Sequence, residues 1–134
     1  MKKRKICIII ASRANYARIK TVLTEIMERP DLDLQLIVSA SALLDRYGRV
    51  ADIIKSDGFK INVESYVVLE GETPATMVKS TGLAMIELAT IFENLKPDFV
   101  VTVADRYETL ATAVAASYMN IPVAHVQGGE ITGS

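Results

Sequence analysis

Five ionisable residues follow or lie within two apolar runs of this chain, residues 99–104 and 121–126: they are Asp105, Arg106, Glu108, His125 and Glu130. Apolar runs of this length, flanked by proline or glycine, are typical of buried parallel strands. Ligands of open parallel sheets lie just beyond the carboxyl ends of the strands. The spacing therefore predicts that these side chains gather at one edge of one sheet, where carboxylates can transfer protons and arginine can bind an anion.

The elements that must position these residues alternate regularly along the chain. Strand-like segments at 6–11, 32–40, 60–69, 99–104 and 121–126 are separated by amphipathic segments at 16–29, 43–55, 74–95 and 107–119. This βα alternation with right-handed crossovers predicts one doubly wound, Rossmann-like α/β domain over residues 1–134, with a parallel sheet of order 3-2-1-4-5. We expect Arg13, Asp105 and the segment 128–130 at one edge of that sheet.

Polar residues mark the expected helix ends. Asn15 is a candidate cap of the first helix, Thr73-Pro74 begins the third, and Asp57-Gly58 closes the second. Asp105 and Glu108 have the D-x-x-E spacing of a capping box. Such a box would explain both residues without catalysis, although a capped carboxylate is also well oriented and kept ionised.

Composition restricts the class of protein. The chain has 134 residues, 50% of them hydrophobic, and a net charge of -1, which argues against broad nucleic-acid or membrane surfaces. The single cysteine, Cys7, lies in the first apolar run and predicts a buried, inert thiol in a reducing, cytoplasmic compartment. No run is expected to be long enough to span a bilayer.

An anion site is predicted where the first strand meets the first helix, at residues 12–15. Free backbone N–H groups and the helix dipole favour a phosphate there, and Arg13 would add a permanent charge. The glycine fingerprints of dinucleotide and P-loop sites are absent. The structural alternatives stay open: Arg13 and Lys20 as solvated surface residues, His125 as a hydrogen-bonded core residue, and Glu130 as a loop residue.

Three motifs in order carry a family resemblance: residues 11–16 with Lys20, residues 104–108, and residues 120–133. They resemble the amino-terminal domain of the UDP-N-acetylglucosamine 2-epimerases, particularly the hydrolysing branch that feeds sialic and legionaminic acid synthesis. The resemblance implies a glycosyltransferase-B-type fold in which two doubly wound domains close on a UDP-sugar. It implies release of UDP and a 2-epimerised amino sugar such as N-acetylmannosamine, without a cofactor or metal. We therefore expect a fragment whose nucleotide-binding second domain is absent, inactive alone, and homo-oligomeric when complete.

The resemblance also implies residue roles. Asp105, Glu130 and Lys20 would be catalytic, with Lys20 on the phosphate side, and the substrate-binding set would be Arg13, Arg106, His125, Gln127, Gly128 and Gly129. Gln127 is a departure, because many relatives have a glutamate there and an amide cannot transfer a proton. Two alternatives remain: a phosphate- or nucleotide-binding module of flavodoxin or receiver type, and a glycosyltransferase of the same fold.

Overall fold

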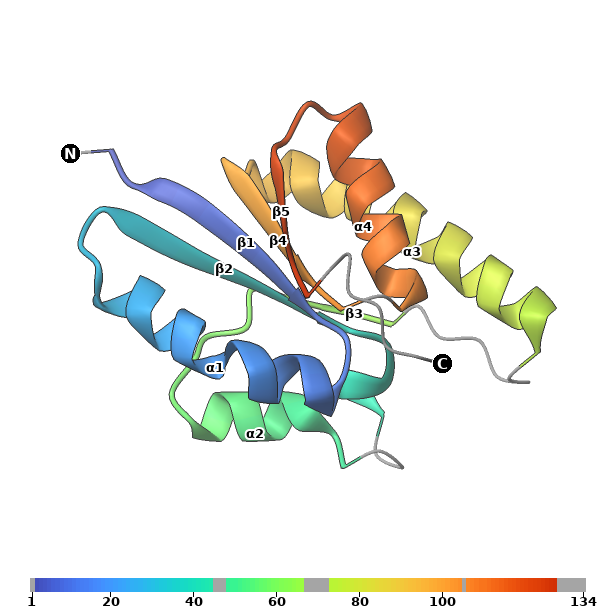
Figure 1. Ribbon diagram of the computed structural model, residues 1–134, viewed down its shortest axis with the longest axis horizontal. Coiled ribbons are helices and arrows are strands. Elements are labelled where there is room, and N and C mark those ends of the chain that lie inside the picture. Colours follow the sequence, from blue (N-terminus) through green and yellow to red (C-terminus); the bar gives the residue numbers. More distant parts are fainter. Residues whose placement is uncertain (1, 45–47, 67–72, 105, 128–134) are drawn as a thin grey trace.

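The computed structural model describes residues 2–44, 48–66, 73–104 and 106–127. It contains a five-stranded parallel sheet of order β3-β2-β1-β4-β5 with helices on both faces, which confirms the predicted doubly wound fold and strand order (Figure 1). The elements are β1 (Arg4–Ile10), α1 (Arg13–Glu28), β2 (Leu32–Ser39), the 3-10 helix η1 (Ala40–Leu43), α2 (Val50–Ser56), β3 (Val63–Ser65), α3 (Pro74–Leu95), β4 (Phe99–Val103), α4 (Tyr107–Tyr118) and β5 (Val123–Val126).

The central strand β1 serves two hydrophobic cores. Ile8 and Ile10 pack toward α1 and α2, whereas Cys7 and Ile9 pack toward α3 and α4. Successive side chains of a strand point to opposite faces, so a strand covered on both faces has to be apolar throughout. Cys7 is fully buried, and burial raises the pKa of its thiol to about 12, which keeps the thiol protonated and unreactive.

The helix α1 begins differently from the prediction. Its N-cap is Ser12, whose Oγ accepts a hydrogen bond from the backbone N–H of Asn15 at 3.1 Å. The prediction of Asn15 as the cap is wrong because its side chain turns back instead, and its Oδ1 accepts from the backbone N–H of Ala11 at 3.1 Å. The two side chains together fix the turn that connects β1 to α1.

Two other predicted helix ends are confirmed. Thr73 caps α3 in a reciprocal capping box with Thr76, and Pro74 occupies the first turn. Asp57 ends α2, and Gly58 follows with φ of +95°, a conformation that favours glycine.

The start of α4 differs from the one that the D-x-x-E spacing predicts. Arg106 is the N-cap of α4, without a side-chain cap bond, so Glu108 is at the second helical position. The Glu108 side chain lies in the interior, and its carboxylate accepts no hydrogen bond from the described residues. Thr109 Oγ1 instead ties the helix start to β4 by donating to the carbonyl of Val103 at 3.2 Å. Asp105 lies outside the described residues.

The expectation about bilayer-spanning length is also wrong. Among the described helices, α3 is long and apolar enough, by length and composition alone, to cross a membrane. Its residues Ala84, Leu88, Ile91 and Phe92 are buried in the core between the sheet and α4. The apolar composition of α3 is therefore partly explained by packing in a globular core.

Candidate active site

The carboxyl edge of the sheet has unusual backbone geometry. Ala40 after β2, Ala104 after β4 and Gln127 after β5 have positive φ angles of 54°, 66° and 66°. A left-handed conformation costs a non-glycine residue roughly 1–2 kcal/mol, and such strain is often found at functional sites. The chain therefore turns sharply at the end of three strands, at the edge where the ligand site was predicted.

Arg13 lies at this edge, at the first position of α1. It is exposed, and its guanidinium rests against Gly48, which has φ of +82° and precedes α2. A Cβ atom added to Gly48 would lie 2.6 Å from Arg13 Nη2. The absence of a side chain at Gly48 thus makes room for the Arg13 guanidinium beside the amino terminus of α1, where the helix dipole favours an anion.

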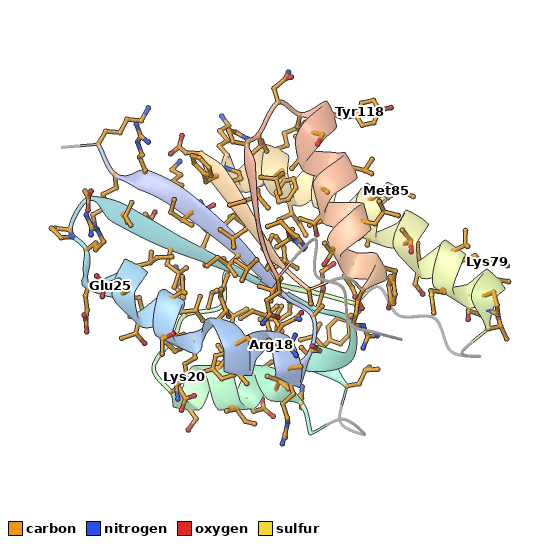
Figure 2. The ribbon with its side chains drawn as sticks, in the orientation of Figure 1. Arg18, Lys20, Glu25, Lys79, Met85 and Tyr118 are labelled. Carbon is orange, nitrogen blue, oxygen red and sulfur yellow. The ribbon has the colours of Figure 1, made fainter. Side chains whose placement is uncertain are left out.

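Lys20 lies farther along α1 and has a partner on another element (Figure 2). Its Nζ is 3.1 Å from Asp57 Oδ2, and the Tyr16 hydroxyl donates to the same oxygen at 2.5 Å. Burial and the bond to Asp57 raise the pKa of Tyr16, while the bonds from Tyr16 and Lys20 lower the pKa of Asp57. Seven residues of helix separate Lys20 from Arg13 by about 10 Å, so the structure does not bring these two cations together.

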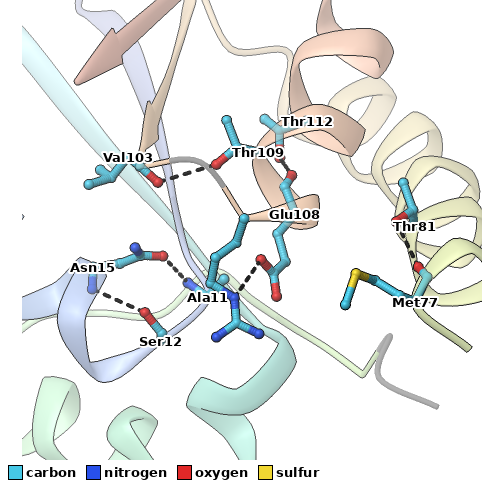
Figure 3. A network of polar contacts seen from close by, with 10 residues as sticks. Ala11, Ser12, Asn15, Met77, Thr81, Val103, Glu108, Thr109 and Thr112 are labelled. Atoms are coloured by element: carbon cyan, nitrogen blue, oxygen red, sulfur yellow. Dashed lines mark hydrogen bonds and ion pairs between the residues drawn. The ribbon is translucent and has the colours of Figure 1, made fainter. Parts of the chain in front are cut away.

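Glu108 is the buried carboxylate of the site. Its side chain is 5% exposed, and Oε2 is 3.4 Å from Nε of Arg106, whose side chain is 51% exposed. Burial raises the pKa of Glu108, and the charge of Arg106 opposes that rise. Figure 3 shows its carboxylate between the start of α4 and the turn at Ala11 and Ser12.

Glu108 also lines two small cavities. One is lined by residues of β1, of the turn into α1, of β4 and of α4: Ile9, Ala11, Asn15, Thr102, Val103, Thr109 and Thr112. The other reaches the ends of β2 and β3 at Ser39 and Ser65. Each has a volume of about 10 Å³, close to the smallest space that holds one water molecule. The β1–α1 turn and the start of α4 therefore adjoin at the sheet edge.

The strand β5 contributes His125 to the candidate site, and Gln127 follows directly after this strand. His125 Nδ1 is 2.7 Å from Thr102 Oγ1 on the neighbouring strand, and the residue is exposed. The prediction of His125 as a hydrogen-bonded core residue is therefore confirmed for the hydrogen bond and wrong for the burial. Gln127 Oε1 accepts a hydrogen bond from Arg18 Nη1 at 2.7 Å. Sequence reasoning missed Arg18, because no local pattern connects residues 109 positions apart.

Four predicted site residues, Asp105, Gly128, Gly129 and Glu130, lie outside the described residues. Their described neighbours Ala104, Arg106 and Gln127 follow β4 and β5 at the predicted edge. Within the described ranges, no group of three or more His, Cys, Asp or Glu side chains is arranged to hold a metal ion. At this edge the described residues provide exposed arginines, helix amino termini and one buried carboxylate.

The structure is a doubly wound α/β domain, with Arg13, Arg106 and the buried Glu108 near the carboxyl ends of its strands. The sequence matches the family described as UDP-N-acetylglucosamine 2-epimerase over residues 24–133, and the chain belongs to this family.

Two relatives are similar over 98% of this chain. A GDP/UDP-N,N'-diacetylbacillosamine 2-epimerase (hydrolysing) from Campylobacter jejuni is 38% identical, and 34% of its length is covered. A UDP-N,N'-diacetylbacillosamine 2-epimerase (hydrolysing) from Legionella pneumophila is 36% identical, and 35% of its length is covered. A crystal structure of a UDP-N-acetylglucosamine 2-epimerase superposes with a TM-score of 0.85 at 25% identity, over 99% of this chain and 35% of that one. The chain thus spans about a third of the length of these relatives.

Proposed function

We propose that this chain is the amino-terminal domain of a hydrolysing 2-epimerase that acts on a UDP-linked 2-acetamido sugar. The observation that supports the proposal is that Arg13 and Arg106 lie at the starts of α1 and α4, the helices that follow the neighbouring strands β1 and β4 of a family-matched sheet. This chain covers about a third of the relatives' length, which leaves room for a second domain, and we propose that this second domain binds most of the nucleotide. On its own, the chain is expected to release UDP at no measurable rate and to bind UDP weakly.

The reaction has to remove a hydrogen that is hardly acidic, because C2 of the sugar is not next to a carbonyl group. Breaking the bond between C1 and the diphosphate oxygen first generates an oxocarbenium-like cation, which makes the C2 proton acidic. Loss of that proton gives a glycal and UDP. Water then supplies the hydroxyl at C1, and a proton returns to C2 on the opposite face.

This path requires positive charge on the departing diphosphate and carboxylates beside the sugar ring. We assign Arg13 and Arg106 to the diphosphate, with Gly128 and Gly129 allowing close backbone approach and His125 and Gln127 contacting substrate. Asp105 and Glu130 are assigned to the sugar, where they stabilise the cation and move protons. Lys20 would have to leave Asp57 to reach the substrate, so its catalytic assignment needs a separate test.

The names of two relatives restrict the choice of candidate sugar substrates. Both hydrolysing relatives are named for N,N'-diacetylbacillosamine, which carries acetamido groups at two ring positions. We therefore propose UDP-N,N'-diacetylbacillosamine as the first substrate to test, with UDP-N-acetylglucosamine as the second.

We also propose that the enzyme is cytoplasmic, since nucleotide sugars are made in the cytoplasm. We propose that it is a homo-oligomer, because Met77, Val78 and Ile86 on α3 are exposed apolar residues.

The test incubates the full-length enzyme with each UDP-sugar in D2O and follows UDP release and the sugar by NMR. A 2-epimerised free sugar carrying deuterium at C2 is expected. Release of UDP without deuterium at C2, and only when an acceptor is added, would contradict the proposal and indicate a glycosyltransferase. Asp105→Asn is expected to slow UDP release roughly a hundredfold or more. Unchanged UDP release in that variant would remove Asp105 from the catalytic set.

A further inference from the structure

The buried Glu108 carboxylate destabilises the folded state, and helix capping does not explain why a glutamate occupies this position. Its side chain is 5% exposed, and neither carboxylate oxygen accepts a hydrogen bond from the described residues. A buried polar group without a hydrogen bond destabilises a folded protein by about 1–3 kcal/mol. For a buried carboxylate the cost is larger, up to several kcal/mol. Two features reduce the cost: the amino terminus of α4 and the ion pair with Arg106.

The surroundings of Glu108 offer hydrogen-bond donors that it does not use. Thr112 Oγ1 lines both cavities beside the carboxylate, yet it donates to the backbone carbonyl of Glu108 at 2.8 Å. Thr109 Oγ1 likewise donates to Val103. The cation beside the Glu108 carboxylate is the Arg106 guanidinium, and the neighbouring Tyr107 side chain also acts on this carboxylate.

Half of the Arg106 side chain is exposed, and it makes no capping bond to α4. Its Nε faces Glu108, which leaves the terminal nitrogens of the guanidinium for other partners. An arginine held through Nε presents its outer nitrogens in a fixed direction, and this geometry suits an oxyanion.

We propose that Glu108 is a positioning residue that fixes the Arg106 guanidinium at the mouth of the site, at the expense of fold stability. The inference rests on the proposed function, since Arg106 is taken to bind the diphosphate of the UDP-sugar. Residues kept for stability and residues kept for function respond to substitution in opposite ways. Glu108→Gln keeps the shape of the side chain but removes its charge, so it separates the two.

The first experiment measures thermal stability and UDP-release kinetics of full-length Glu108→Gln. The expected result is an unchanged or higher melting temperature together with a KM for the UDP-sugar raised about tenfold. Glu64→Gln is the matched control, because Glu64 also has a buried oxygen and cation partners, Arg49 and Lys55, but lies on β3. Its KM is expected to stay within twofold of the parent. A lower melting temperature with unchanged KM for Glu108→Gln would show a purely structural role and overturn the inference.

The second experiment uses Arg106→Gln alone and combined with Glu108→Gln. If Glu108 acts through Arg106, the double variant has the same KM as Arg106→Gln, whereas independent effects would multiply. Multiplying effects would overturn the inference.

A third measurement needs no substrate and is made on the 134-residue chain, by carbon-detected NMR of the Glu108 carboxyl group. Its titration midpoint is expected above the ordinary glutamate value of 4.5 and to rise further in Arg106→Gln. An unmoved midpoint in Arg106→Gln would refute the pairing itself. A moved midpoint in a chain whose full-length form releases no UDP would leave the pairing intact and contradict the proposed function instead.

Discussion

Gly48→Ala offers a test of the anion site through a single methyl group. The added Cβ would lie 2.6 Å from Arg13 Nη2, whereas ordinary contact begins near 3.4 Å, so the guanidinium has to move by most of an ångström. Arg13 is flexible and exposed, so it moves more readily than the backbone. A misplacement of about 1 Å in a binding group can reduce turnover up to a hundredfold. Hydrogen bonds to a charged group contribute about 1.5–3 kcal/mol, which corresponds to roughly 10- to 100-fold in affinity.

The expected result is a 10- to 100-fold lower kcat/KM, on the order of these contributions, for UDP release by full-length Gly48→Ala. Alanine at a positive φ also costs stability, about 1–2 kcal/mol, which in a chain of full-length size is about 2–8 °C in melting temperature. Gly58→Ala is the matched control, because Gly58 has φ of +95° and no atom within 4 Å of an added Cβ. Gly58→Ala should lose similar stability and retain its kcat/KM.

Equal kinetics for Gly48→Ala and Gly58→Ala would refute the reasoning, since backbone strain would then account for everything. A further comparison starts from Arg13→Ala. In that background Gly48→Ala should lower kcat/KM no more than Gly58→Ala does, because the group it displaces is already gone. A full additional loss would show that Gly48 acts through something other than Arg13.

Three further outcomes are expected. Lys20→Met removes a half-exposed ion pair with Asp57, so it should cost less than about 1 kcal/mol and leave the rate of UDP release within a few-fold; a loss of several hundredfold would instead place Lys20 in the catalytic set. Gln127→Glu sets a carboxylate against Arg18, which keeps it ionised, so the melting temperature and the UDP-release rate should change little, and a large rate increase would contradict this pairing. The pKa of Glu108 is raised above the ordinary glutamate value of 4.5, and Arg106 and Tyr107 are the ionisable groups that act on it. Ionisation of Glu108 therefore destabilises the fold as pH rises from 4.5 through the pKa of the folded state. The melting-temperature advantage of Glu108→Gln over the parent should grow over that pH range and be absent below it.

The architecture was predictable because its signals are local. The βα alternation, Thr73-Pro74 and Asp57-Gly58 each depend on residues a few positions apart, and the strand order follows from right-handed crossovers. Local signals were also ambiguous where two residues of one type compete. Ser12 and Asn15 are both good caps, and only the folded turn shows that Ser12 has that role.

The site was predictable at the level of its edge and not at the level of its contacts. The positions of Arg13, Arg106 and Gln127 after β1, β4 and β5 follow from the topology. Contacts between distant segments do not, and the pairing of Arg18 with Gln127 and the packing of Arg13 on Gly48 are of this kind. The inward side chain of Glu108 was misjudged for the same reason, because its spacing from Asp105 matched a local motif.

The left-handed residues after β2, β4 and β5 have a consequence for how this chain tolerates sequence change. At Ala40, Ala104 and Gln127 the backbone disfavours β-branched residues more than other types, whereas glycine fits without penalty and asparagine fits better than most residues. A library of variants selected for folding alone should therefore accumulate glycine at these three positions. A library selected for turnover should retain a residue other than glycine wherever the greater backbone freedom of glycine would change the conformation of the turn. The difference between the two libraries would mark which of the three turns is kept rigid for the reaction.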